Sequence, residues 1–494
     1  MLSKFKVMII CPKILYAIVK ETKIVCKISF CIILILAGCS MDNRSIIKPL
    51  KNLPESFSDN GKTLLPDMWW TSFNDEHLNQ FIQKAFQKNY SIKASWNRLQ
   101  QASAMVTKDR ADFFPDIGWN TSHSYQKSNS DSDKTNKDFS HSFGIMAGYE
   151  IDLWGRIRSA VNAQQLNAQI KLEDIKTSAI SLSAAIAGTW YQIIEYRGQL
   201  KLLQAQIKTN TKYLKIITEK FLQGQGNAAD MLQQKQVIEA IKGEIQNLMW
   251  NLKIAEHRMC IYLSQIPGSL KFPEINDLPL LPELPKTGIP AEILGQRPDV
   301  KSAWLLVESK NSDVFKALSN RYPKLSISAS TNLTSSSIED IFKNWLINLT
   351  ASLLGPIFDG HRRKADVEQA QAVLSEKINL YGQTVLIAVK EVEDALIKEQ
   401  HSNKYLKSLE KQYELASQSA DSILKQYLKG AEEYTRYLNA RLSCQRLEKT
   451  MLTAKLNLIL NRISLYRALA GGFDLKDINM QSENNQHNSQ QDNN

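Results

Sequence analysis

The chain contains few residues whose spacing could support catalysis or metal binding. Its seven histidines are scattered, and no His-x-x-x-His, Cys-x-x-Cys, phosphate-binding loop or Gly-x-Ser-x-Gly sequence is present. Glu391, Glu393 and Asp394 are neighbouring carboxylates, but they fall in a long helical pattern and are predicted to form a solvated face. The sequence therefore predicts no enzyme, no catalytic residues, no metal site and no dissociable cofactor.

Cys39 has the clearest chemistry, because Leu36-Ala37-Gly38 precede it. This order resembles the bacterial lipobox, which implies cleavage before the cysteine and lipid on its thiol and new amino group. Basic residues and a short apolar run precede the motif, as in a secretory signal. That run is shorter than the roughly 20 residues of a spanning helix. We expect residues 1–38 to be a lipoprotein signal peptide and Cys39 to carry N-acyl (palmitate) and S-diacylglycerol lipid.

Removal of this signal changes the charge and the set of cysteines. The full chain carries +11, and loss of six Lys and one Glu lowers this charge to +6. So small an excess gives little support for nucleic-acid binding, and we expect none. Cys260 and Cys444 remain beside the lipidated Cys39, and both lie in helical patterns. They are predicted to be packed thiols, with a disulfide as the alternative in an oxidising periplasm.

A series of short motifs occurs twice, about 205 to 208 residues apart. Residues 89–96 align without gaps on residues 297–304, with the Lys and the Trp identical. Three further matches follow in the same order: 114–117 with 322–325, 153–156 with 358–361, and 221–224 with 427–430. A period this long is not that of a solenoid. It indicates that one large unit was duplicated, giving a pseudo-symmetric body around an axis.

Each half contains two alternating segments that predict a β-hairpin. Residues 117–128 and 139–151 place apolar residues on one face and mainly Ser, Gly, Gln and Asn on the other, and residues 325–333 and 345–353 repeat the pattern. Strands of about 9 to 11 residues can cross a bilayer with the apolar face outward. A soluble sandwich would alternate in the same way. Four strands cannot close a barrel with a lumen, so membrane strands would require several chains.

Long helical patterns accompany both hairpins. Apolar residues recur at helical spacing from Asn74 to about Ala111. Further helices are predicted over residues 156–221, 229–265, 363–428 and 433–469. The longest would span about 100 Å, which favours coiled-coil packing over a globular core. Residues 267–290, with six prolines, predict an extended connector.

Together these features resemble the TolC-like outer-membrane efflux proteins, in particular the lipidated branch of tripartite resistance-nodulation-division pumps. The resemblance runs from the lipobox to about Gly472. It is carried, in order, by Trp70–Phe73 with Asp75 and Leu78, Phe114–Pro115, Tyr149–Arg156, Arg297–Asp299, Pro356–Gly360, Glu391–Leu396 and Leu465–Gly472. We expect Arg297–Asp299 to start the first helix of the second repeat.

The resemblance implies a mixed fold, mainly α-helical with a transmembrane β-barrel. A homotrimer would close a twelve-stranded outer-membrane barrel that continues into a twelve-helix periplasmic tunnel, leaving no strand edge in lipid. His141 and His361 are expected to be polar groups of an interface or the lumen rather than metal ligands. The expected segments are a signal peptide (1–38), a lipidated N-terminal segment (39–73), a first repeat (74–266, hairpin 117–151), a connector (267–290), a second repeat (291–472, hairpin 325–354) and a disordered polar tail (473–494).

The implied function is that of a passive exit duct for drugs or other small toxic compounds. The expected partners are an inner-membrane efflux transporter, a periplasmic membrane-fusion adaptor and outer-membrane lipid, with the protein anchored in the outer membrane. A type I protein-secretion duct is the alternative within the family. A periplasmic coiled-coil structural or adhesion lipoprotein is the alternative from another class.

The resemblance also locates the functional point at the periplasmic tip, where the helices must converge to seal the tunnel. Tip turns are expected at Gly224 and Gly430. The gate candidates are Tyr427, Glu432, Glu433, Arg436 and Asn439, with Phe221, Asp230 and Gln233 as first-half counterparts. Glu432 and Glu433 from three chains would form a cation-attracting ring. We predict that Glu432 or Asp230 pairs with Arg436, against the alternative of an ordinary surface pair between Glu433 and Arg436, worth a few tenths of a kcal/mol.

Overall fold

The computed structural model describes residues 54–64, 66–129, 135–288, 290 and 295–469. They belong to one compact unit, Pro49–Asn494. The predicted signal peptide, Cys39 and the polar tail (473–494) lie outside the described residues. Residues 291–294, with which the second repeat was expected to begin, also lie outside them.

The described elements occur in two similar series along the chain. The first comprises η1 (Trp69–Phe73), α2 (Glu76–Lys88), α3 (Tyr90–Ala111), β1 (Asp116–Asn129), β2 (Thr135–Ile151), α4 (Arg156–Leu222) and α5 (Ala228–Tyr262). The second comprises α7 (Pro298–Ser319), β3 (Lys324–Ser335), η2 (Ile338–Asp340), β4 (Trp345–Leu354), α8 (Arg362–Leu428) and α9 (Tyr434–Leu469). α3 and α7 have 22 residues each, and α4 and α8 have 67 each.

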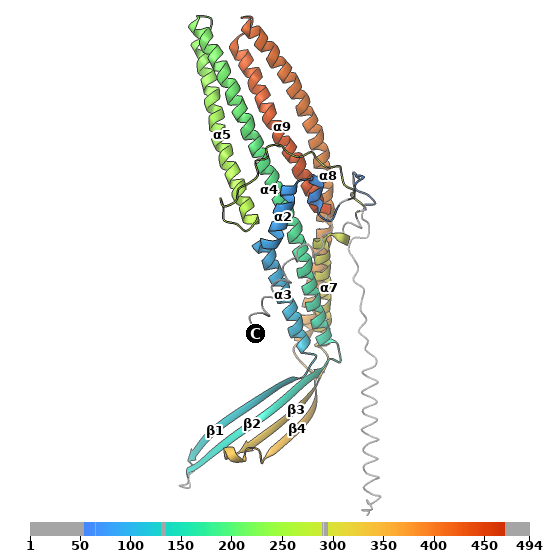
Figure 1. Ribbon diagram of the computed structural model, residues 1–494. Helices are drawn as coiled ribbons and strands as arrows, with labels where there is room; N and C mark the ends of the chain where they lie inside the picture. Colours follow the sequence, from blue (N-terminus) through green and yellow to red (C-terminus); the bar gives the residue numbers. More distant parts are fainter. Residues whose placement is uncertain (1–53, 65, 130–134, 289, 291–294, 470–494) are drawn as a thin grey trace, which may run out of the picture. The chain divides into compact units, whose positions relative to one another are not determined.

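The strands form one antiparallel sheet in the order β1-β2-β3-β4, beyond one end of α4 and α8 (Figure 1). Each hairpin of the sequence pairs its own strands, and β2 pairs with β3 to join the two hairpins. Every residue of β4 is exposed within the chain. β1 and β4 are therefore the open edges of the sheet that a single chain forms.

Along α4 and α8, two different sets of four helices follow one another (Figure 1). Next to the sheet, α3 packs on α4, α4 on α7, and α7 on α8. Farther away, α5 packs on α4, α4 on α9, and α9 on α8. Each 67-residue helix is long enough to serve both sets, at about 100 Å.

Asn89 divides the first helical segment in two, where the sequence predicted one helix from Asn74 to about Ala111. Its backbone is extended (ψ 125°), and its side chain accepts hydrogen bonds from the N–H groups of Ser91 (2.8 Å) and Ile92 (3.2 Å). Its amide also donates to the carbonyl of Tyr262 at the end of α5 (2.8 Å). Asn89 therefore caps α3 and ties it to α5, which the apolar periodicity did not reveal.

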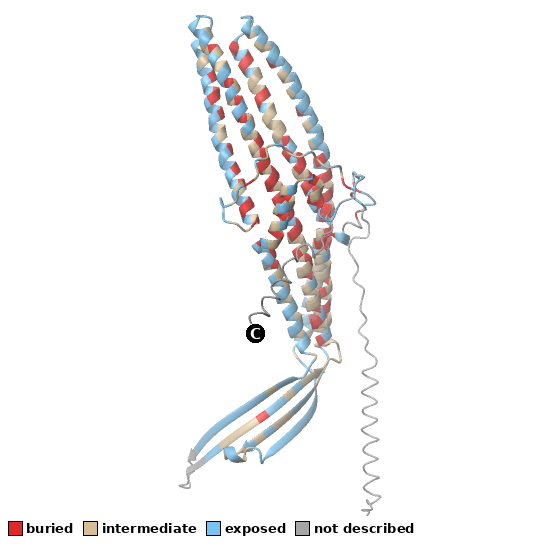
Figure 2. Ribbon diagram, viewed as in Figure 1, coloured by how far each residue is buried: buried red, intermediate tan, exposed pale blue. Residues whose placement is uncertain are grey.

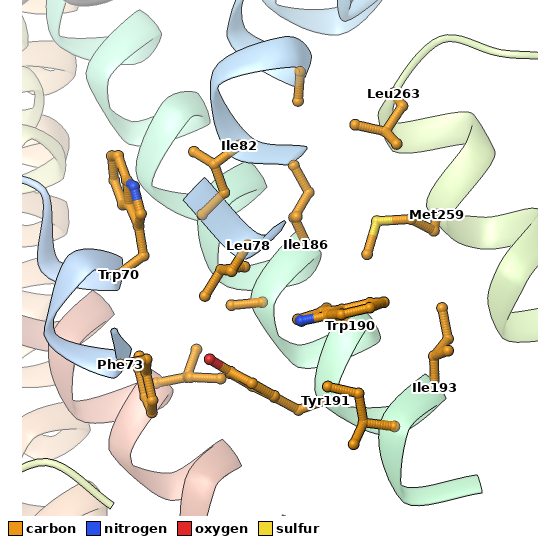
Figure 3. Close-up of a cluster of buried hydrophobic side chains, with 14 of the residues drawn as sticks. Trp70, Phe73, Leu78, Ile82, Ile186, Trp190, Tyr191, Ile193, Met259 and Leu263 are labelled. Atoms are coloured by element: carbon orange, nitrogen blue, oxygen red, sulfur yellow. The ribbon is translucent and has the colours of Figure 1, made fainter. Parts of the chain in front are cut away.

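The main hydrophobic core lies where η1 and α2 pack against α4 and α5 (Figure 3). Trp190 is fully buried and donates its indole N–H to Asp75 (2.7 Å), whose other carboxylate oxygen caps α2 through the N–H of Leu78 (3.1 Å). Phe73 packs on Tyr191 and Tyr466. These contacts explain the Trp70–Phe73, Asp75 and Leu78 motif as a structural anchor of the N-terminal segment. Cys260 and Cys444 are buried free thiols, as the sequence predicted.

The connector is fastened to the helices by a buried arginine. Arg462 of α9 donates to both carboxylate oxygens of Glu399 on α8 (2.8 and 2.5 Å) and to the carbonyls of Pro282 (2.5 Å) and Glu283 (2.7 Å). Its side chain is only 2% exposed. A buried charge is tolerated only when it is paired and hydrogen-bonded, and this one joins two helices to the chain segment that crosses them.

A second arginine corrects the interpretation of Glu391 as a solvated carboxylate. Arg297 precedes α7, which begins at Pro298, and its guanidinium donates to Asp299 (2.7 Å), Glu391 (2.8 Å) and the carbonyl of Ala468 (2.8 Å). Arg297 starts the helix as expected and also clamps α7 to α8 and α9. The helical position of Glu391 could not show this, because its partner lies 94 residues earlier in the chain.

Glu399→Ala is expected to lower the free energy of unfolding by about 3–5 kcal/mol, because Arg462 keeps its burial and loses its counter-charge. Urea unfolding of the solubilised protein measures this change, and proteolysis of the connector should accelerate. The matched control is Glu414→Ala on the same helix, whose pair with Lys411 is exposed to solvent and should contribute little to stability. Equal effects of the two substitutions would contradict the anchoring role.

Candidate functional site

The candidate site is the tip where α4 turns into α5 and α8 turns into α9. Gly224 and Gly430 have φ values of +72° and +78°, in the left-handed region that favours glycine. Their N–H groups bond to the carbonyls of Phe221 and Tyr427 (3.0 Å each), and the next N–H in each turn bonds one residue further back along the helix. Both turns are thus Schellman caps, which satisfy the last carbonyls of the two long helices.

Four tyrosines pack beside these turns and join α4 to the α8–α9 pair. The ring of Tyr437 lies 5.2 Å from that of Tyr213 and 6.4 Å from that of Tyr427, and Tyr427 lies 5.6 Å from Tyr434. Lys220 of α4 places its ammonium 4.4 Å from the centre of the Tyr427 ring and donates to the Tyr427 carbonyl (3.3 Å). Aromatic packing and a cation–π contact therefore connect the helical hairpin α4–α5 to the helical hairpin α8–α9.

A buried chain of polar groups crosses three helices within this cluster. Gln234 of α5 is 1% exposed and donates to the carbonyl and side-chain oxygens of Asn210 on α4 (2.8 and 3.0 Å). The hydroxyl of Tyr434 on α9 donates to the side-chain oxygen of Gln234. Every hydrogen-bonding atom of Gln234 that faces the interior has a partner, so the chain fixes the relative rotation of the helices.

The charged candidates form two groups at the tip. Glu432 forms an ion pair with Arg436 four residues later, so the pairing of Arg436 with Glu432 is present, while Asp230 and Glu433 make no ion pair with it among the described residues. Burial raises the pKa of the Asp230 carboxyl above its ordinary value; a backbone hydrogen bond at Asn227 opposes this rise, and the nearby charge of Glu433 adds to it. The carboxylates of Asp230, at the start of α5, and Glu433, just before α9, thus repel each other.

The remaining candidates are peripheral within the chain. Gln233, Asn439 and Phe221 are exposed, and the side chains of Gln233 and Asn439 form no hydrogen bond in the described part of the chain. Sequence reasoning missed Asn210, Tyr434 and Gln234. A signal was available for Gln234, because it precedes Val237 and Ile238 by three and four residues and so shares their buried face.

Metal clusters and membrane-spanning helices are both absent from the described residues. No group of three or more His, Cys, Asp or Glu side chains lies close enough to hold a metal ion. None of the described helices combines the length and the apolar character needed to cross a membrane.

The comparison with protein families decides the assignment. The family model for outer membrane efflux proteins matches two stretches of the chain, residues 81–260 and 289–471. The chain belongs to the outer membrane efflux protein family. It is accordingly an efflux channel of the outer membrane and the exit duct of a tripartite pump, which confirms the family, function and location expected from the sequence.

Individual relatives cover most of the chain at low identity. The pyoverdine export outer membrane protein OpmQ of Pseudomonas aeruginosa is 24% identical over 82% of this chain and 87% of its own length. The cation efflux system protein CusC of Escherichia coli is 25% identical over 90% of this chain and 99% of its own length. The open-state MtrE outer membrane channel of Neisseria gonorrhoeae shares the fold, with a TM-score of 0.80 at 22% identity over 88% of this chain and 99% of its own.

Gln234→Ala should loosen the tip, because it leaves the oxygens of Asn210 and the hydroxyl of Tyr434 buried without their partner. Each such loss costs about 1–3 kcal/mol. Amide hydrogen exchange around the α4–α5 turn should therefore become roughly 5- to 150-fold faster. The control is Gln233→Ala, an exposed neighbour on the same helix, which should leave exchange unchanged. Identical exchange in both variants would show that the buried chain does not hold the tip.

Proposed function

We propose that three copies of the chain form the duct, with a twelve-stranded barrel in the outer membrane and a twelve-helix periplasmic tunnel. The observation that carries this proposal is the four-stranded sheet with open edges at β1 and β4. A bilayer offers no water to the N–H and C=O groups of an edge strand, so such a sheet must be closed by further strands. Threefold assembly supplies them through one repeated contact, between β4 of one copy and β1 of the next.

The helices support the same assembly. α5 and α8 end the set of four far from the sheet, and both carry large apolar side chains that are exposed within the chain. On α5 these are Leu232, Met249, Trp250, Ile254 and Ile261; on α8 they include Leu386, Ile387, Ile397 and Leu415. Exposed apolar surface of this extent is typical of an interface. The trimer would bury it between neighbouring copies in the same step that closes the sheet.

Several equalities between the two halves support a tandem duplication. α3 and α7 have equal lengths, as do α4 and α8, and α5 and α9 differ by one residue. The family model also matches each half separately. α4 and α8 both follow a residue in the left-handed conformation, Gly155 (φ 77°) and His361 (φ 69°). By conformation Gly155 therefore corresponds to His361, one residue beyond the Gly360 with which the short motifs aligned it. Six similar units would surround the axis of the trimer.

We propose that transport through such a duct is passive. An inner-membrane transporter would supply the energy and a periplasmic adaptor would join it to the tip. The relatives are named for pyoverdine export and for cation efflux, so this fold accepts cargo of more than one kind. We further propose that lipid on Cys39 anchors the segment that precedes Trp69 to the outer membrane.

Glu433 is proposed as the residue that makes the closed entrance attractive to cations. Glu432 is neutralised by Arg436, whereas Glu433 is exposed and unpaired within the described residues. Three copies of Glu433 and Asp230 would then concentrate negative potential at the tip. The sequence treated Glu432 and Glu433 as equivalent members of a ring, but only Glu433 has a carboxylate without a paired charge among the described residues.

Glu433→Gln should reduce cation selectivity more than Glu432→Gln, since only the first removes an unpaired charge. Reversal potentials across a planar bilayer with a salt gradient measure the selectivity. Glu239→Gln, an exposed glutamate farther along α5 that pairs with Lys242, is the control and should leave the reversal potential unchanged. Unchanged selectivity in Glu433→Gln would refute its role at the entrance.

The duct itself is tested by the assembly and conductance of the purified protein. We expect a trimer that dissociates on heating and forms single channels in planar bilayers. Trp345→Asp on the open edge strand β4 should weaken the trimer, because it puts a charge into the proposed lipid face of the barrel. The cost of an acidic residue there is smaller than the roughly 2–4 kcal/mol of an Arg or Lys at the bilayer midplane. A monomeric protein without channel activity would overturn the proposal.

A further inference from the structure

Two histidines lie directly opposite each other on the first hairpin. His123 of β1 is in register with His141 of β2, and their Nδ1 atoms are 2.6 Å apart. The ring centres are 4.9 Å apart. Two ring nitrogens approach this closely only when at least one ring is neutral and accepts the proton of the other. The backbone pairing, and not only the rotamers, therefore places two nitrogen ligands side by side.

The pair is out of keeping with the other residues on its face of the hairpin. The next cross-strand pair toward the loop is Tyr125 with Phe139, whose ring centres are 4.9 Å apart, and the pair on the other side is Thr121 with Phe143. Ser122 and Ser142 bond to each other on the opposite face. Two imidazoles thus stand together beside an aromatic pair on one side and Thr121 with Phe143 on the other.

We propose that His123 and His141 form a binding site for a divalent transition-metal ion of the imidazole-preferring class, such as Cu²⁺, Ni²⁺ or Zn²⁺. Metal–nitrogen distances of about 2.0–2.1 Å place two adjacent ligands of one ion about 3 Å apart. The observed separation of 2.6 Å would have to widen only slightly. His123 is exposed and His141 is half-buried, so small rotations of the rings can supply this change.

The rest of the coordination sphere follows from the sheet. On the third strand, Ser335 of β3 stands opposite His141, so that His123, His141 and Ser335 form one row across three strands. Its hydroxyl could orient a water on the metal, and waters would complete the remaining positions. Two imidazoles with oxygen ligands suit Cu²⁺ best among these ions. The bound ion would cross-link β1, an open edge of the sheet, to β2.

Cu²⁺ alone is the probe, titrated into the purified full-length protein in detergent and followed by electron paramagnetic resonance. We expect one ion per chain, with a spectrum showing two equatorial nitrogens. His123→Asn or His141→Asn should leave one nitrogen and weaken binding at least tenfold. His401→Asn, an exposed lone histidine on α8, is the matched control and should bind Cu²⁺ as the wild type does.

The double variant His123→Asn with His141→Asn decides between this site and any other. Loss of the two-nitrogen signal in a protein that still forms its native assembly supports the proposal. An unchanged stoichiometry and spectrum would overturn it, as would the absence of saturable Cu²⁺ binding to the wild type. Trimer migration and channel conductance of each variant verify folding. His123, His141 and Ser335 lie on the same face of the sheet as Trp345, one row nearer the loops. In the proposed duct the ion would therefore bind on the outer face of the barrel, at its loop end. Both histidines come from one hairpin, so the two proposals can still fail separately.

Discussion

The constraint on which the rest of this structure depends is that backbone N–H and C=O groups must be paired inside a lipid bilayer. One chain supplies four strands in an open sheet, and its edges at β1 and β4 cannot remain open in lipid. The same chain supplies a layer of helices that ends at α5 and α8 with apolar side chains exposed. In the proposed trimer a single rotational contact between copies would answer both needs, so membrane insertion and tunnel formation would be coupled.

The helices are stabilised unevenly along their length. Figure 2 shows buried residues concentrated in the middle of α4 and α8 and in the C-terminal half of α9, where η1, α2 and the connector cover them, and fewer toward the tips. The two arginines that clamp the helices lie in the same region. Arg462 of α9 bonds to the connector, and Arg297 lies at the start of α7. Local stability follows the density of buried contacts. The middle is therefore built to stay fixed, while the tip depends on one aromatic cluster and a few polar bonds.

Sequence periodicity was sufficient for the elements but not for the connections between them. The alternating segments and the long apolar repeats predicted both hairpins and the long helices, because those patterns are local. The break at Asn89 was missed, since its cause is a bond to Tyr262, distant in sequence. Glu391 was misjudged for the same reason. At the tip, the family resemblance directed attention to Gln233, whereas burial selects Gln234. A shift of one residue turns a helix by about 100°, and only the packing shows which face is inside.

The two halves differ most where the gate is proposed. α5 begins at Ala228 and α9 at Tyr434, so Tyr434, Tyr437 and Leu438 correspond in position to Ala228, Met231 and Leu232. Tyr434, Tyr437 and Leu438 are buried within the chain. Leu232, in contrast, is 61% exposed, and Ala228 is also exposed. The start of α9 is therefore fixed to α4 and α5 of its own chain, while the start of α5 keeps an apolar surface for another partner. A tip built from six identical units would have no reason to open at one contact before another. In this chain the internal contact is held by Tyr434 and Gln234. In the proposed trimer, the contact of α5 with a neighbouring copy would therefore be the one to separate.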